Sequence, residues 1–377
     1  MPDPLEFCSL TELRRRTSMK WRTHDADVLP LWVAEADVAA PPGVVEAVTR
    51  VVAAGDTGYP AGDAYARALA AFAADRWDWD GLDTDRARLV PDVMQGIVEV
   101  LRTVLPAGAA VAVTPPVYPP FFTFLRHAGW EPVAAPLTSD GRLDPEALQR
   151  VFRLRRVRAF LLCSPHNPTG TVHTAEELAT VAGLARSTDV TVVADEIHAP
   201  LVDPGSPFTP WLSVPGAETG FSLMSASKGW NLAGLKAAVA IGGPEAPLDR
   251  LPAEMLEVGA SHVAVHAHVA ALETDRRWLD RFVAAVARNR ELLAELLSVH
   301  LPPVRYRPAP ATFLAWLDCR ELGLGPDPAA TFLERGRVAL NAGEPFGTGG
   351  AGHVRLNLAT GPDVIGEAVH RMAVALR

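Results

Sequence analysis

Lysine is scarce in this sequence: only three of its 35 basic residues are lysines, and arginine supplies the rest. Two of the three, Lys228 and Lys236, lie in the single segment 225–236, Ser-Ala-Ser-Lys-Gly-Trp-Asn-Leu-Ala-Gly-Leu-Lys. A desolvated lysine amine loses its proton and condenses with a carbonyl group, whereas a guanidinium stays protonated near neutral pH. A lysine that persists here is therefore a candidate for chemistry, although composition alone fits equally well with chance survival on a solvated surface.

Cysteine and long apolar runs are also rare. The three cysteines, Cys8, Cys163 and Cys319, show no metal-ligand spacing and cannot all pair with one another, which favours buried thiols in a reducing compartment. The longest apolar stretches, residues 157–163 and 190–194, are far shorter than the roughly 20 residues of a transmembrane helix. The first residues lack the basic start and apolar run of a secretory signal. These features predict a cytoplasmic protein with no membrane partner.

The charge balance limits the partners further. The formal net charge is −9, and a negatively charged protein repels the phosphate backbone of nucleic acids. We therefore expect no nucleic-acid partner.

The hydrophobic pattern predicts an α/β fold. The chain has 377 residues, of which 49% are hydrophobic, and this suits a globular protein of about two domains. Longer helical patterns alternate with short apolar runs, as in an α/β domain with a mainly parallel sheet; the runs are residues 109–114, 159–163, 190–194, 221–225 and 237–241. A long amphipathic pattern at 273–299 precedes segments typical of a smaller α+β domain. We expect a large domain of residues 41–275 and a small domain of residues 1–40 and 276–377.

Four of the apolar runs end in polar or turn residues. These endings begin at Thr114, Ser164, Asp195 and Ser225. In open α/β sheets the carboxyl ends of the strands face the ligand crevice, so we expect the four segments to converge on one site.

Several side chains near these endings are suited to ligand binding. Asn167 lies between two prolines directly after an apolar run, a costly loop unless its amide is aimed at a ligand. Asp195 offers a carboxylate for a protonated ring nitrogen, and His198 offers an imidazole for a phenolic oxygen. Each is more often structural when it occurs alone. Chance explains them poorly once Lys228 and Arg355 are added.

These motifs resemble the fold-type I pyridoxal-phosphate enzymes of the class I/II aminotransferase group. The matching stretches are Pro-His-Asn-Pro-Thr-Gly, Asp-Glu-Ile-His, Ser-x-Ser-Lys-x-x-Asn-x-x-Gly-Leu and Val-Arg-Leu-Asn, in this order along nearly the whole chain. Within that group the sequence is most similar to the MalY/PatB-type cystathionine beta-lyases, or C-S lyases. The resemblance implies pyridoxal 5'-phosphate as the cofactor, an amino acid as the substrate, and a mainly parallel sheet between helices in the large domain.

The resemblance also implies roles around the cofactor ring. Lys228 would bond the cofactor covalently and then move protons, and Asp195 would keep the ring nitrogen protonated. Tyr118 would stack on the ring. Asn167 and His198 would hydrogen-bond the ring's 3' oxygen.

Further matching residues are implied at the phosphate and the substrate. The phosphate would rest on backbone amides at a helix start near Val93 and Met94, with help from three side chains: Ser225, Ser227 and Lys236. Arg355 would hold the substrate carboxylate as a bidentate fork. Tyr59 would reach the phosphate of the neighbouring subunit, so a homodimer with a shared active site is implied.

Two departures from the family pattern concern the site. Where relatives show Ala-Asp-Met-Asp-Phe, this chain has Ala-Glu-Ala-Asp-Val at residues 34–38; this segment borders the substrate pocket in the family, which places Ala34 and Glu35 beside the substrate. Asp92 replaces the glycine of the phosphate loop and puts an anion near the predicted phosphate, which is compatible with binding if its side chain points away. The third lysine, Lys20, lies in a stretch similar to the family's Ser-x-Lys-Trp and has no role that the sequence reveals.

The leading functional hypothesis is α,β-elimination from a cysteine S-conjugate such as cystathionine, which yields a thiol, pyruvate and ammonia. The same residues also fit an aminotransferase, in which Lys228 would return the proton to the cofactor. Decarboxylation or oxidative deamination of the conjugate is a third alternative, because the pocket-edge segment differs from that of relatives. A pyridoxal-phosphate-binding regulatory protein is disfavoured, because a binding module needs no carboxylate-gripping Arg355 beside a reactive lysine.

Three histidines, His262, His266 and His268, are spaced two and four residues apart. A helical pattern rich in Ala and Val surrounds them, and no neighbouring cysteine or carboxylate completes a ligand set. We therefore expect packing or interface histidines and no metal.

Overall fold

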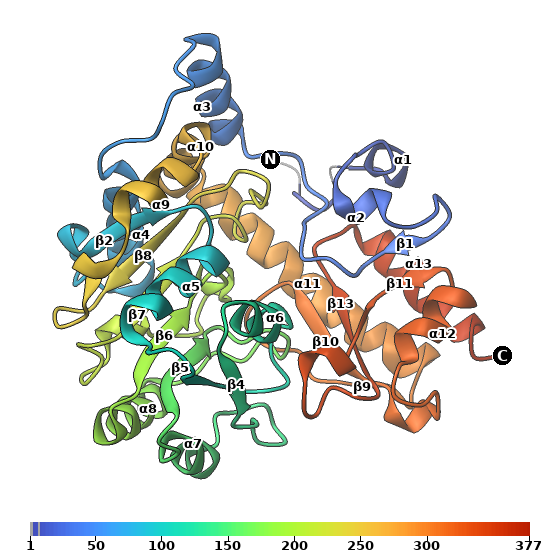
Figure 1. Cartoon of the computed structure of the whole chain (residues 1–377). Coiled ribbons are helices and arrows are strands. Elements are labelled where there is room, and N and C mark those ends of the chain that lie inside the picture. The colour runs from blue at the N-terminus through green and yellow to red at the C-terminus, as the bar shows by residue number, and fades with distance from the viewer. Residues whose placement is uncertain (1–2, 7) are drawn as a thin grey trace.

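The computed structural model describes residues 3–6 and 8–377, so residues 1, 2 and 7 of the predicted small domain lie outside the described part. Its main feature is a seven-stranded sheet (Figure 1). In spatial order the strands are β2 (Ala87–Val90), β8 (Ala238–Gly242), β7 (Phe221–Met224), β6 (Thr191–Asp195), β5 (Val157–Cys163), β3 (Ala110–Val113) and β4 (Glu131–Ala134). Six of these strands run in one direction, and β8 is antiparallel to both of its neighbours.

Helices cover both faces of this sheet, which explains why its central strands are mainly apolar. The side chains of β3 alternate between the faces: Val111 and Val113 belong to the apolar cluster that contains α5 and α6, whereas Ala110 and Ala112 belong to the cluster that contains α7 and α8. The bounds of these helices are α5 (Val93–Val104), α6 (Pro120–His127), α7 (Pro145–Phe152) and α8 (Ala175–Thr188).

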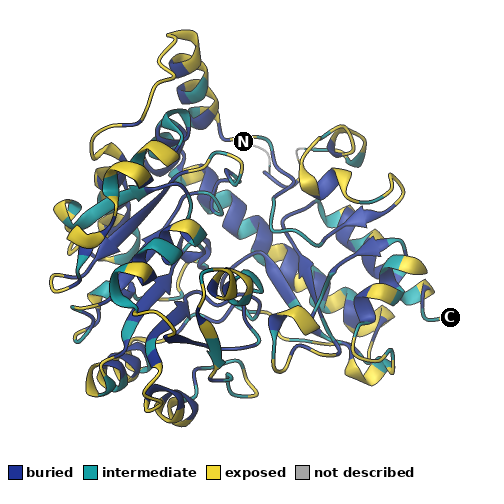
Figure 2. Ribbon diagram, in the orientation of Figure 1, coloured by how far each residue is buried: buried dark blue, intermediate teal, exposed yellow. Residues whose placement is uncertain are grey.

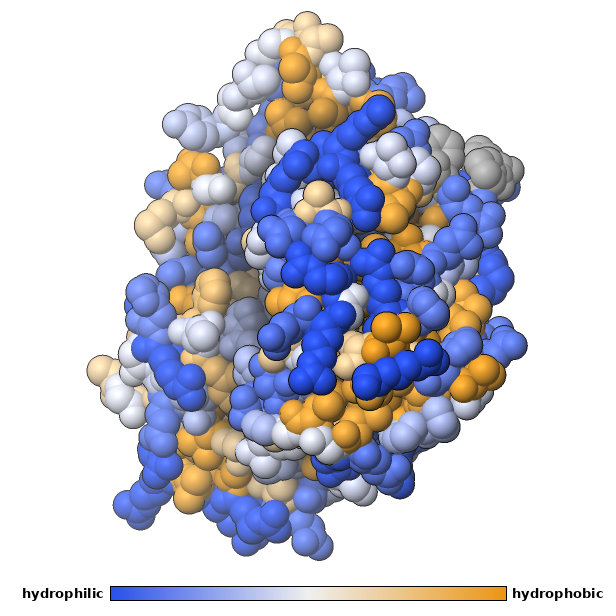
Figure 3. Space-filling view, turned by 90° about the vertical axis from the view of Figure 1, so that its right-hand side faces the viewer, coloured by the Kyte–Doolittle hydropathy of each residue, from blue (hydrophilic) through white to orange (hydrophobic). Residues whose placement is uncertain are grey.

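A second, smaller sheet lies toward the C-terminus. It is antiparallel and has the order β12 (Asn341–Ala342), β13 (His353–Asn357), β10 (Leu314–Asp318) and β9 (Arg305–Tyr306). Beside it, β1 (Leu29–Pro30) pairs in parallel with β11 (Val338–Ala339) and so ties the N-terminal segment to the C-terminal part. The helices of this part are α1 (Leu10–Leu13), α2 (Met19–Arg22), α12 (Pro328–Glu334) and α13 (Pro362–Val374). Hydrophilic side chains cover much of its outer face (Figure 3).

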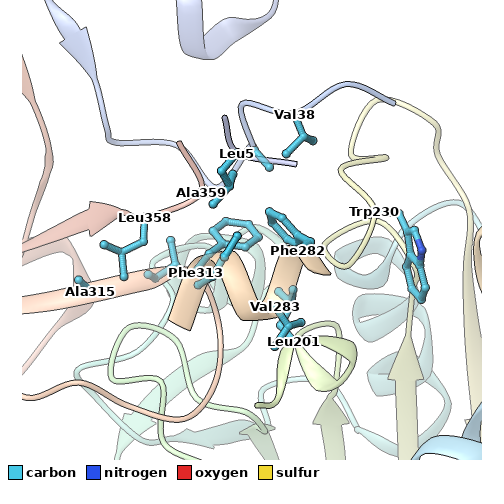
Figure 4. Close-up of a cluster of buried hydrophobic side chains, with 14 of the residues drawn as sticks. Leu5, Val38, Leu201, Trp230, Phe282, Val283, Phe313, Ala315, Leu358 and Ala359 are labelled. Carbon is cyan, nitrogen blue, oxygen red and sulfur yellow. The ribbon is translucent and has the colours of Figure 1, made fainter. Parts of the chain in front are cut away.

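The long helix α11 (Arg276–His300) runs between the two parts of the molecule (Figure 1). It buries Phe282 and Val283, and the ring of Phe282 lies 6.1 Å from that of Phe313. Val38 of the N-terminal segment and Leu358 after β13 belong to the same apolar cluster (Figure 4). Segments far apart in the sequence therefore share one core at this joint.

The remaining helices lie at the edge of the large sheet. They are α3 (Pro42–Ala53), α4 (Ala64–Trp77), α9 (Ala253–Gly259) and α10 (His262–Thr274), and α10 packs against both α3 and α4. The far end of α3 projects from the molecule, and residues 52–59 are exposed throughout (Figure 2). In this view the strands of the large sheet are mostly buried, whereas the end of α3 is exposed.

The structure confirms the predicted α/β fold with a mainly parallel sheet and a smaller α+β part. The long helix predicted at residues 273–299 is also present as α11. It begins at Arg276, and residues 273 and 274 belong to the end of α10. The limits of the two domains stay a prediction. Among the described residues, no helix is both long enough and apolar enough to span a bilayer.

Candidate active site

A cavity of about 260 Å³ lies where β5, β6 and β7 end and α5 begins. Its lining contains most of the predicted site residues: Ala34, Val93, Met94, Tyr118, Asn167, Asp195, His198, Ser225, Ser227, Lys228 and Lys236. Arg355 joins this set through a hydrogen bond to Asn167. Glu35 and Tyr59 do not line the cavity. The expected convergence of the strand endings is therefore confirmed.

Lys228 follows β7 and brings its amine to the cavity. Its Nζ donates to the backbone oxygen of Ala34, 2.9 Å away. Burial, followed by the charge of Arg355, lowers the pKa of Lys228 to about 8, although the carboxylates of Glu35 and Asp195 oppose this shift. A larger share of this amine is unprotonated near neutral pH than in an ordinary lysine.

Asp195 closes β6 and is buried. Its Oδ1 accepts a hydrogen bond of 3.1 Å from the backbone N–H of Ile197. Burial raises the pKa of Asp195 to about 6, while this backbone donor and the charge of Lys228 lower it. A carboxylate that is poorly solvated in this way is stabilised by a cationic partner, such as a protonated ring nitrogen.

His198 and Tyr118 offer polar and aromatic contacts to a ligand in the cavity. Burial, and then the charges of Lys228 and Arg355, hold the pKa of His198 well below its usual value, so the imidazole is neutral. Among the described residues, its Nδ1 is buried without a hydrogen-bond partner. Tyr118 is positioned by the preceding residue, Val117, whose N–H donates to a loop of the smaller part. Both rings are thus available to a ligand.

Arg355 lies on β13, and its guanidinium is buried. It donates to Asn167 Oδ1 at 2.9 Å and to the backbone oxygen of Trp32 at 3.2 Å, and it lies 5.2 Å from the ring centre of Phe346. Its Nε is buried without a partner, and within the described residues no carboxylate pairs with it. Burial lowers the pKa of Arg355 to about 10. A buried guanidinium in this condition is suited to bind a ligand carboxylate.

The start of α5 presents the backbone amides that were predicted to hold a phosphate. Asp92 does not point away from this helix start: its Oδ1 accepts from the backbone N–H of Gln95 at 2.9 Å, and its Oδ2 lies 3.2 Å from Lys236 Nζ. Lys236 is exposed, and an exposed ion pair of this kind contributes only about 0–1 kcal/mol. A bound phosphate could therefore take over Lys236 at little cost. Ser225 Oγ already donates to the backbone oxygen of Ala237.

Residues 32–38, which we call the N-terminal strap, contribute Ala34 to the lining of the cavity. Asn231 holds the backbone of Ala36 from both sides, as acceptor at 2.8 Å and as donor at 3.0 Å. Asn357 donates to the backbone oxygens of Val33 and Glu35, each at 2.7 Å. The strap is thus fastened to the segments that carry Lys228 and Arg355.

Lys20 fastens the strap from its other side. Its Nζ lies 2.7 Å from Asp37 Oδ2 and donates to the backbone oxygen of Glu35 at 3.2 Å. The indole N–H of Trp21 donates to the other carboxylate oxygen of Asp37. Lys20 and Asp37 are both 1% exposed, so each needs the other to satisfy its charge. The third lysine of the chain therefore has a structural role at the site.

We expect Asn231→Gly to loosen the strap without straining the backbone, because Asn231 has a φ of 56°, which glycine tolerates. The loss of two hydrogen bonds lowers the free energy of unfolding by about 1–3 kcal/mol. Urea unfolding measures this loss, and limited proteolysis within residues 32–38 measures the loosening. Asp78→Gly is the matched control, because Asp78 has a φ of 51° and lies on the C-cap of α4. Equal proteolysis of the two variants would contradict the assigned fastening.

The sequence analysis missed four residues that support the site. Asn231, Asn357 and Glu196 lie inside the motifs that carried the resemblance, but no role was expected for them. Glu196 is buried behind Asp195, accepts from Ser222 Oγ and from the backbone N–H of Trp211, and burial raises its pKa to about 8. Lys20 was noticed only for its rarity. Their polarity among apolar neighbours in the sequence was the available signal.

One of the three histidines packs in the core, as expected, and the other two lie beside a carboxylate that the sequence did not reveal. His268 packs in the core, where its Nδ1 contacts the hydroxyl of Tyr65 at 2.7 Å and its Nε2 contacts the backbone oxygen of Leu235 at 2.9 Å. A carboxylate does complete a possible ligand set with the other two: Asp56, which precedes α4, lies beside His262 and His266. The absence of a nearby carboxylate in the sequence was therefore misleading, because the third group comes from a distant segment.

Comparison with known proteins agrees with the geometry. The family model of aminotransferase class I and II matches residues 27–372. A protein of Mycobacterium leprae (strain TN) that is named as a cystathionine beta-lyase is 52% identical and covers 99% of this chain and 98% of its own length. Cystathionine beta-lyase PatB of Bacillus subtilis (strain 168) is 30% identical over 95% of this chain and 96% of that protein.

A solved structure supports the same relationship. A beta-cystathionase of Corynebacterium diphtheriae, described as PLP-dependent, has a TM-score of 0.91 and 35% identity to this chain, with 98% of each chain covered. The resemblance inferred from the motifs is confirmed by these relatives. The chain belongs to the aminotransferase class I and II family.

Proposed function

We propose that this protein is a pyridoxal 5'-phosphate-dependent C-S lyase that cleaves a cysteine S-conjugate such as cystathionine by α,β-elimination. The conjugate and one water become a thiol, pyruvate and ammonia. The observation that carries the proposal is the buried Arg355 guanidinium, which lacks a carboxylate partner within the described residues and lies beside the cavity of the Lys228 amine. An amino-acid carboxylate bound there would bring its alpha carbon toward that amine. The names of the relatives support the same reaction.

The cavity residues fit the cofactor. The buried carboxylate of Asp195 is complementary to a protonated pyridine nitrogen. The unpartnered Nδ1 of His198 is complementary to a ring oxygen. Val93 and Met94 are the first two residues of α5, and amides at a helix start have no partner inside the helix, so they suit a phosphate. Lys228 supplies the amine for covalent attachment.

The residues of the chain divide the work of the reaction. When bound, pyridoxal phosphate supplies an electron sink that stabilises negative charge at the substrate's alpha carbon. Lys228 removes the proton from that carbon as a general base, for which a pKa of about 8 is suitable near neutral pH. Arg355 orients the carboxylate, and the N-terminal strap limits the access of water from one side.

We also propose a homodimer with a shared active site. Tyr59, which was expected to reach the cofactor phosphate of the neighbouring subunit, is 79% exposed in this chain. Val45 and Val52 on α3 are exposed as well, at 49% and 53%. Exposed aromatic and apolar side chains on one projecting element suit contact with a second copy, in which Tyr59 would reach the neighbouring cavity.

A cytoplasmic location is proposed from the state of the cysteines. Cys8, Cys163 and Cys319 are all free thiols in the structure. Burial raises the pKa of Cys319 to about 12 and raises that of Cys163 still further, so these two thiols are unreactive. Free thiols of this kind suit a reducing compartment.

Product analysis tests the proposed reaction. The cofactor-loaded protein is incubated with cystathionine and with S-methylcysteine, and thiol, pyruvate and ammonia are measured together. We expect the three products in equal amounts. An aminotransferase would instead form an oxo acid that keeps the sulfur substituent, and a decarboxylase would release carbon dioxide. Either outcome, or no pyruvate from any conjugate, would overturn the proposed elimination.

A further inference from the structure

Asp56, His262 and His266 form a compact group at the edge of the large sheet, outside the active-site cavity. The two histidines lie on the first turns of α10, and Asp56 lies in the segment between α3 and α4. His262 Nε2 is 3.2 Å from Asp56 Oδ2, and the two imidazole rings are 4.7 Å apart at an angle of 85°. One ligand atom from each residue lies within 4.8 Å of the other two.

The donor set and its spacing suit a transition-metal ion. Residues four apart on a helix lie on the same face, so both imidazoles can approach one ion. Two histidines and a carboxylate are a common Zn²⁺ ligand set, with bonds of about 2.0–2.2 Å. Tetrahedral geometry then places neighbouring ligand atoms roughly 3.3 Å apart, close to the observed separation of His262 and Asp56. The ligand atom of His266 lies within 4.8 Å of the other two and would have to move closer to them on binding the ion.

The burial of His262 also favours a metal. Both of its ring nitrogens are buried without a hydrogen-bond partner among the described residues, and only Nε2 approaches the carboxylate of Asp56. An imidazole nitrogen without such a partner is suited to bind a metal ion. Arg50 on α3 adds a positive charge nearby, but its guanidinium lies 3.7 Å from the carboxylate of Glu46. The Asp56 side chain is 65% exposed in the single chain, before any contact with the second copy proposed above.

We propose that Asp56, His262 and His266 bind one divalent transition-metal ion, with Zn²⁺ as the best match and water as the fourth ligand. The ion joins the segment that follows α3 to α10. In the single chain residues 52–59 are exposed throughout, and a Cβ on Gly55 or Gly58 would meet open space, so contacts with the ion and with the second copy would be what hold this segment. Metal binding therefore orders the segment that carries Tyr59, three residues after Asp56.

Helix α10, which carries both histidines, also contacts the segment at the phosphate end of the cavity. The backbone N–H of Ser261, which caps α10, donates to the backbone oxygen of Lys236 at 3.0 Å. His268 on the same helix contacts Tyr65, whose hydroxyl accepts from the backbone N–H of Ala226. The helix that would carry the metal thus supports the segment of Lys228 from behind.

Calorimetric titration with zinc chloride tests the site. The cofactor-loaded protein, free of any histidine tag, is treated with a chelator, desalted and titrated. We expect one Zn²⁺ per chain in the wild type and at least a tenfold weaker affinity in Asp56→Asn and in His266→Ala. His300→Ala is the matched control, because His300 is exposed at the end of α11 and outside the group, and it should bind as the wild type does.

Thermal unfolding provides a second measurement that does not depend on heat of binding. Zn²⁺ should raise the unfolding midpoint of the wild type and of His300→Ala, because a ligand that binds the folded state stabilises it. At the same Zn²⁺ concentration it should raise the midpoints of Asp56→Asn and His266→Ala less. Absence of stoichiometric binding in the wild type, or binding of equal strength in all four proteins, would overturn the proposal and leave a simple Asp56–His262 ion pair.

Discussion

Lys228→Ala is expected to lower the rate of pyruvate release from cystathionine by at least about 10³-fold, because it removes both the covalent attachment point and the general base. In the described part of the chain no other amine is placed to replace it: Lys236, the second lysine at the cavity, lies 3.2 Å from Asp92. The visible absorption of the covalently attached cofactor should disappear at the same time. Turnover is measured by pyruvate formation and attachment by the absorption spectrum.

Two further variants separate the chemistry of Lys228 from its charge. Lys228→Arg keeps a cation at the cavity but cannot supply a free amine, so it should be as inactive as Lys228→Ala. Lys236→Ala is the matched control, because it removes the other lysine of the same segment. It should keep the covalent attachment and bind the cofactor more weakly. Unchanged turnover in Lys228→Ala would rule out the assigned role.

Arg355→Lys is expected to reduce kcat/KM for cystathionine by about 10²-fold, although the positive charge is kept. The substrate carboxylate loses the bidentate contact, and a hydrogen bond between charged groups contributes about 1.5–3 kcal/mol. Arg355→Ala should lose more, because no cation then faces the carboxylate, and Asn167 Oδ1 loses its donor as well. Steady-state kinetics measure both variants.

The cofactor should stay bound in both Arg355 variants, since Arg355 contacts Asn167 and Trp32 and does not line the cavity itself. Retained visible absorption with a raised KM would therefore distinguish loss of substrate binding from loss of cofactor. Arg320→Lys is a suitable control, because Arg320 is exposed and pairs with Asp318. If the Arg355 variants were saturated by the same concentration of substrate as the wild type, the assigned contact would be wrong.

The central strands of the large sheet were predictable because they are buried on both faces. β3, β5, β6 and β7 are mainly apolar, and each overlaps its predicted range closely. The two strands that were not predicted, β2 and β4, are the edges of the sheet. Edge strands are partly solvated: β4 contains Glu131 and Pro132, and β2 contains Arg88. Their pattern is too mixed to signal a strand.

Strand direction was not predictable. Residues 237–241 form an apolar run like the others, yet β8 runs against its neighbours. A short buried strand has the same composition in either direction, because direction depends on how the flanking segments return to the sheet. The expected convergence of four strand endings succeeded because those endings belong to β3, β5, β6 and β7, which are parallel.

The sequence alone determined the chemical components of this protein. The rare Lys228, the Asp195 that ends a buried strand and the isolated Arg355 were recognisable because chemistry demands those side chains at those motifs. The tertiary structure alone decided what holds them: the Lys20–Asp37 pair under the N-terminal strap, the contact of Asp92 with Lys236, and the carboxylate of Asp56 beside two histidines. Each of these contacts joins residues far apart in the chain or on different elements. Such contacts depend on how packed elements meet in space, and local sequence patterns carry no record of that.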